Sequence, residues 1–223
     1  NVRSEDFKAG YTLQNLEVNN FRDKSQINRA KNIIGEVITN SGFDLAEELP
    51  DDAPQALKDL KSSFAKLSEA GIDSKTAGKE VKQARASLFA AKAVEDPKFS
   101  NIALGTMLGN LSQAHDKAVK RGNSSVFKVA LGDGSTAAIN IGKDTDISSA
   151  MAELIKASSK RQNLYSSGKI SYDQMYNAIK ADYMGLESIG AKMGLYNLAG
   201  LRPGTAALTG ESVPVEKDIT QVV

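Results

Sequence analysis

Cysteine and tryptophan are absent from this 223-residue chain, and His115 is its single histidine. The absence of cysteine excludes disulfide bonds, thiol catalysis and cysteine-based metal sites. A zinc site built from histidine needs two or three of these side chains, so we predict no metal. Aromatic residues make up only 6% of the chain, which predicts a core of Leu, Ile, Val and Ala.

Neither sign of charge is in excess, because 28 Lys and Arg residues stand against 27 Asp and Glu residues. A protein that binds nucleic acid or a membrane surface needs a basic face that outweighs its acids, so no nucleic-acid partner is predicted. No run of apolar residues approaches the ~18 that a membrane helix needs, so no membrane span is predicted. A chain without cysteine tolerates oxidising and reducing surroundings alike, and composition leaves the compartment open.

Apolar residues recur at spacings of three and four along most of the chain, which predicts amphipathic helices. Capping residues, Gly or Pro bound each of these segments, with Ser25, Asp52 and Ser171 as predicted caps. We predict helices that run from Ser25 to Asn40, from Pro54 to Gly71, from Ser74 to Asp96, from Ser100 to Gly122, from about Asp146 through Ile155 to Gly168, and from Ser171 through Ile189.

One segment alternates apolar and polar residues instead, on both sides of the turn sequence Gly132-Asp133-Gly134. This pattern predicts a β-hairpin with strands near 126–131 and 135–141. The predicted fold is therefore mainly α, a multi-helix bundle of about six helices with one β-hairpin insertion and an extended C-terminal tail. We expect an N-terminal arm at 1–24, a helical domain at 25–199 with the hairpin at 126–141, and the tail at 200–223.

The stretch from Asn163 to Gln174 has the outline of a calcium-binding EF-hand loop, with Gly168 at the sixth position. Calcium requires oxygen ligands at the first, third and fifth positions and a bidentate Glu at the twelfth. Tyr165 is a poor ligand, and Gln174 carries no charge. We predict instead a corner between two helices, in which Ser171 and Gln174 form a capping box at the start of the second helix.

The stretch LTGESVPVEKD, residues 208–218, resembles the actuator-domain loop of P-type ATPases. In that family the glutamate that matches Glu211 helps water attack an aspartyl-phosphate. The resemblance covers about eleven residues, and the phosphorylated Asp-Lys-Thr-Gly sequence of the family does not occur in this chain. Since Pro214 fixes an extended backbone and Gly210 permits a turn, we interpret this stretch as part of the extended tail.

No phosphate-binding glycine loop and no nucleophile elbow occurs in the sequence. We therefore predict no catalytic residue and no cofactor, and we expect a non-enzymatic structural or interaction protein, a helical subunit or adaptor of a larger assembly such as a phage virion component or a secreted bacterial module. The alternative is an enzyme whose site is built from scattered residues. A protein partner or a second copy of the chain is expected to bind the apolar residues of the tail and two tyrosines of the last helix: Leu208, Val213, Val215, Ile219, Val222, Tyr172 and Tyr176.

Overall fold

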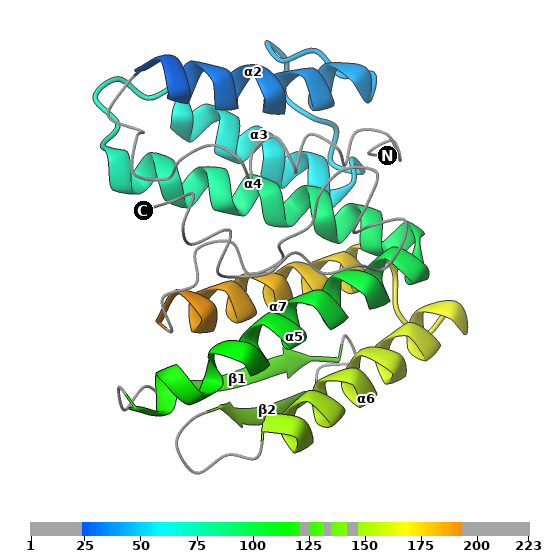
Figure 1. Ribbon diagram of the computed structural model, residues 1–223. Coiled ribbons are helices and arrows are strands. Elements are labelled where there is room, and N and C mark those ends of the chain that lie inside the picture. Colours follow the sequence, from blue (N-terminus) through cyan, green and yellow to red (C-terminus); the bar gives the residue numbers. More distant parts are fainter. Residues whose placement is uncertain (1–23, 121–124, 132–134, 142–146, 193–223) are drawn as a thin grey trace. The chain divides into compact units, whose positions relative to one another are not determined.

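The computed structural model describes residues 24–120, 125–131, 135–141 and 147–192 (Figure 1). Within these ranges there are six helices and one two-stranded antiparallel sheet, and 78% of the residues are helical. The prediction of a mainly α bundle with one β-hairpin is confirmed. The predicted tail, and the predicted arm apart from its last residue, lie outside the described residues.

The six helices and two strands follow one another in the predicted order. Their bounds are α2 Lys24–Asn40, α3 Gln55–Leu67, α4 Ser74–Glu95, α5 Pro97–Lys120, β1 Ser125–Ala130, β2 Thr136–Ile141, α6 Ile147–Ser166 and α7 Tyr172–Lys192.

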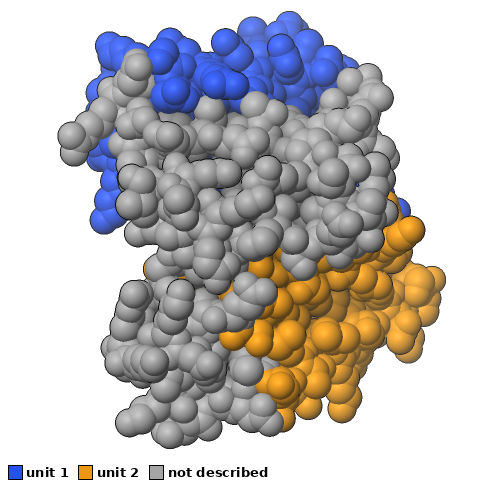
Figure 2. All heavy atoms as spheres, viewed as in Figure 1, with its two compact units in different colours: residues 1–95 blue, residues 96–223 orange. Residues whose placement is uncertain are grey.

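The chain divides into two compact units, Asn1–Glu95 and Asp96–Val223 (Figure 2). The first contains α2, α3 and α4, and the second contains α5, the hairpin, α6 and α7. The predicted helical domain, residues 25–199, therefore includes helices from both units.

In unit 1, α3 packs against both α2 and α4 (Figure 1). The contact between α2 and α3 is close at Gly35, where an added Cβ would lie 3.2 Å from Leu45 Cδ1 and 3.3 Å from Phe64 Cε2. The absence of a side chain at this position lets the Phe64 ring approach the α2 backbone. The apolar stripe predicted for α2 is buried, with Ala30, Ile34 and Ile38 at 0% exposure.

Positive backbone φ angles mark the ends of three helices. Gly42, Gly71 and Gly168 have φ of 94°, 76° and 77°, a conformation that costs glycine little and other residues much. Gly42 and Gly168 lie just beyond the ends of α2 and α6, close to the predicted ends. α3 already ends at Leu67, so Gly71, its predicted end, lies instead in the turn before α4.

Three predicted helix starts are corrected by the structure. α2 already includes Lys24, so Ser25 lies inside this helix and is not its cap. α5 begins at Pro97 rather than Ser100, because Asp96 Oδ1 accepts the Phe99 backbone N–H at 3.2 Å and acts as the cap. Ser100 is a buried helical residue. α3 begins after Pro54, which occupies the cap position without a side-chain hydrogen bond, so Asp52 is not its cap.

In unit 2, α7 packs on β1, α6 packs on β2, and α5 contacts both helices. The predicted capping box at the start of α7 is present: the Ser171 N–H donates to Gln174 Oε1 at 2.8 Å, and the Gln174 N–H donates to Ser171 Oγ at 3.2 Å. The stretch from Asn163 to Gln174 is thus a corner between α6 and α7, as predicted.

The buried face of α6 differs from the prediction. Leu154 is buried, but Ile155, which we placed in the same apolar stripe, is 50% exposed. The buried positions are Ala150, Leu154, Ala157, Ser158 and Arg161, which follow the helical period from one face. The buried face of α6 thus includes a charged residue, Arg161, that the predicted apolar stripe did not contain.

Candidate functional site

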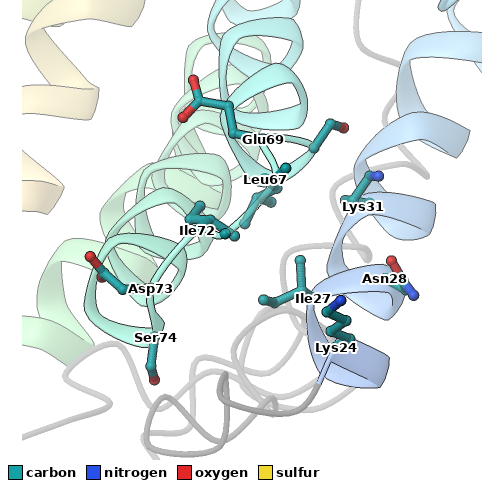
Figure 3. A pocket seen from close by; sticks show the side chains of 12 residues that line it. Lys24, Ile27, Asn28, Lys31, Leu67, Glu69, Ile72, Asp73 and Ser74 are labelled. Carbon is teal, nitrogen blue, oxygen red and sulfur yellow. The ribbon is translucent and has the colours of Figure 1, made fainter.

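A hollow of about 470 Å³ lies in unit 1 between the first half of α2 and the turn that joins α3 to α4 (Figure 3). Its floor is apolar: Ile27 and Leu67 are buried, Ile72 is half-buried, and the three side chains lie between the two walls in Figure 3. The volume lies within the ~300–1,000 Å³ of typical small-ligand sites, so it can take one or two side chains of a ligand.

The α2 wall of the hollow carries Lys24, Asn28 and Lys31. Residues four and seven apart lie on one helix face, which explains why the three side chains line the same wall. The Lys31 Nζ lies 5.5 Å from the centroid of the Phe64 ring, a cation–π distance that fixes this ammonium group at the rim. Lys24 is exposed.

The opposite wall is formed by the end of α3, Gly71 and the start of α4. Asp73 Oδ1 accepts the Thr76 backbone N–H at 2.7 Å and so caps α4. Hydrogen bonds from the Thr76 backbone and from its side chain hold the pKa of Asp73 below the ordinary value of 3.8. Figure 3 shows the carboxylates of Asp73 and Glu69 directed away from α2.

A buried ion pair joins α6 and α7 in unit 2. Arg161 Nη2 lies 2.5 Å from Asp182 Oδ2, and the two side chains are 4% and 6% exposed. The second carboxylate oxygen, Asp182 Oδ1, is buried and accepts no hydrogen bond from the described residues. Burial raises the pKa of Asp182 to about 6, and the charge and hydrogen bond of Arg161 act in the opposite direction.

The sequence contains a signal for this pair that the predicted apolar stripes did not include. Arg161 is four residues from Ala157 and seven from Leu154, so it falls on the buried face of α6. Asp182 is likewise three residues from Ile179 in the apolar stripe of α7. Opposite charges on the apolar faces of two successive helices predict a buried ion pair, because a lone buried charge would be too costly.

The hairpin offers a second kind of binding geometry. Its register pairs residues 125–130 with residues 141–136, and the Leu131 N–H donates to the Ser135 carbonyl at 3.0 Å. Since hydrogen-bonded and non-hydrogen-bonded pairs alternate in an antiparallel ladder, the N–H and C=O groups of residues 126, 128, 130, 136, 138 and 140 point outward from the two strands.

Of the residues predicted to bind a partner, the structure describes two. Tyr176 is completely buried in unit 2, and Tyr172 is half-buried at the first position of α7. Tyr176 therefore belongs to the core, like its neighbour Met175, and its side chain is not part of the surface of this unit. Leu208, Val213, Val215, Ile219 and Val222 lie outside the described residues.

No protein-family model, curated protein or solved structure matches this chain. Within the described ranges, no group of three or more His, Asp or Glu side chains is placed to hold a metal ion. No helix in the described part of the chain combines the length and the apolar character needed to cross a membrane.

Proposed function

We propose that this protein is a non-enzymatic structural or interaction protein, a helical subunit or adaptor of a larger assembly. A phage virion component or a secreted bacterial module would suit this description. The observation that carries the proposal is the hairpin β1–β2, the one sheet among the described residues, which has two strands and therefore two outer edges. Edges of this kind accept an additional strand from another chain, and proteins use them for recognition.

The strand to be added comes, in this proposal, from the tail of a second copy or of a partner subunit. Val213 and Val215, and the segment from Ile219 to Val223, place apolar residues at the alternate spacing that suits an added strand. Pro203 and Pro214 disfavour a helix in this part of the chain. Backbone hydrogen bonds would supply the affinity, and the alternate apolar side chains would supply the specificity.

Deletion of residues 201–223 tests this proposal. The truncated chain is expected to keep the thermal unfolding of the full chain nearly unchanged while losing the assembly that light scattering detects. A truncated monomer that loses most of its stability would mean that the tail belongs to the core. A full chain that stays monomeric at its highest soluble concentration would contradict assembly through a second copy.

A sharper variant is Ala138→Pro, which removes an outward N–H from the edge of β2 while leaving the bonds between β1 and β2 in place. Ala138→Ser keeps this N–H and is the matched control. We expect the proline variant to weaken assembly and the serine variant to assemble normally.

A second candidate function, an enzyme with a site of scattered residues, is favoured by one observation. Asp182 is a buried carboxyl group whose pKa is raised to about 6, and perturbed groups of this kind occur often at catalytic sites. A small molecule that stabilises the wild-type protein but not Asp182→Asn in a thermal-shift screen would support this candidate. The ion pair with Arg161 gives Asp182 a structural role that needs no substrate.

A further inference from the structure

We propose that the hollow of unit 1 binds an acidic, aliphatic segment of a partner protein, with an aliphatic side chain on the floor and a neighbouring carboxylate beside Lys24 and Lys31. The inference rests on the proposed function in one respect, because it takes the ligand to be a protein. It concerns a different surface from the hairpin edge and the tail, so the two can fail separately.

The floor determines the aliphatic part of the ligand. Leu67 is 2% exposed and Ile27 is 7% exposed, so only a small apolar area of each faces the opening, and the half-buried Ile72 completes the floor. These three side chains are branched aliphatics that offer no hydrogen bond. An aliphatic side chain of a ligand removes this apolar surface from water without leaving a polar group unsatisfied.

The charges on the α2 wall determine the acidic part. From residue 24 to residue 35, α2 carries Lys24, Arg29 and Lys31 and no Asp or Glu. Lys24 and Lys31 line the hollow, and the Phe64 ring holds Lys31 at the rim. The potential on this side is therefore positive and attracts a carboxylate.

The hollow is lined by two lysines and two acids, and its positive charges lie on the α2 wall. The Asp73 carboxylate accepts the Thr76 N–H as a helix cap, and Figure 3 shows the Asp73 and Glu69 carboxylates pointing away from α2.

The polar groups around the floor favour a peptide as the source of this chemistry. Asn28, Ser68 and Ser74 line the hollow beside the apolar residues. Asn28 and Ser74 offer an amide and a hydroxyl group to a ligand backbone, whereas the Ser68 hydroxyl donates to the Phe64 carbonyl and is left to accept. A peptide segment presents N–H and C=O groups at short intervals and can use several of them. An anionic amphiphile such as a fatty acid presents one polar end.

Selection from a random peptide display library against the full chain tests the inference. We expect the selected peptides to carry Leu, Ile or Val next to Asp or Glu. The variant Lys24→Glu/Lys31→Glu should bind these peptides at least about tenfold more weakly, since it replaces two attractions by two repulsions. The matched control is Lys156→Glu/Lys160→Glu, which reverses two exposed charges on α6 and should change binding less than about twofold.

Ile72→Asp tests the floor separately, and its circular dichroism spectrum checks that the helices remain folded. We expect this variant to lose peptide binding, because the new carboxylate would face an aliphatic ligand. The inference is overturned if the selected peptides lack the acidic–aliphatic pairing, if they bind the variants as well as the wild type, or if laurate binds the hollow and the peptides do not. None of these outcomes affects assembly measured by light scattering, which tests the proposed function.

Discussion

Replacement of Asp182 by Asn should destabilise unit 2 by about 3–5 kcal/mol, the usual loss when one partner of a buried ion pair is removed. Asn keeps the shape of Asp but removes the charge that balances Arg161, whose side chain is 4% exposed. The guanidinium group would then remain buried without the Asp182 carboxylate beside it. A loss of this size is a large part of the ~5–15 kcal/mol that stabilises a typical domain.

The measurement is urea unfolding followed by the near-ultraviolet circular dichroism of tyrosine. Five of the six tyrosines fall within residues 96–223, so this signal reports on unit 2. The probe has to be specific to one unit because a chain with two units need not unfold in one step. A loss below about 1 kcal/mol, as for an exposed pair, would refute the reasoning.

A double replacement, Arg161→Met with Asp182→Leu, is the control for this prediction. It removes both charges and fills the space with apolar atoms, so we expect stability within about 1 kcal/mol of the wild type or above it. A double variant as unstable as Asp182→Asn would mean that shape, rather than the unbalanced charge, causes the loss.

Two further results are expected. Ser171→Ala removes the capping box and should cost about 1 kcal/mol by urea unfolding, whereas an unchanged midpoint would mean that the cap is dispensable. In Gly105→Ala the added Cβ meets no atom within 4 Å, so this variant should have a higher melting temperature through a helix-propensity gain of up to ~1 kcal/mol. In Gly35→Ala the close contacts of the added Cβ should cancel that gain. Equal melting temperatures of the two variants would contradict the packing of α2 on α3.

Local signals in the sequence predicted the elements well where short-range chemistry determines them. The spacing of Ser171 and Gln174 identified a capping box, and Gly168 identified the turn before it. The alternation around residues 132–134 identified the two strands within one residue of each end. These features depend on residues that are near each other in the chain, so a pattern is enough to locate them.

The errors in the prediction come from alternatives that the pattern leaves open. Asp96 and Ser100 are both good caps, and Asp96 is the cap in the structure because Pro97 is well suited to the first helical position. The burial of Arg161 depends on Asp182, which lies 21 residues further along the chain in another helix. The hollow in unit 1 depends on how α2 packs against the turn between α3 and α4. These segments are distant in the sequence, so no local motif predicts their packing.

Hydrogen exchange at the hairpin tests the proposed assembly most directly. In the full chain at high concentration, we predict that outward N–H groups such as those of Lys128 or Ala138 exchange slowly, and that deletion of residues 201–223 makes them exchange fast. The inward N–H groups of Val129 and Ala137 should stay protected in both proteins, because they bond within the hairpin. Equal exchange of the outward groups in the full and truncated chains would contradict the addition of the tail to this edge.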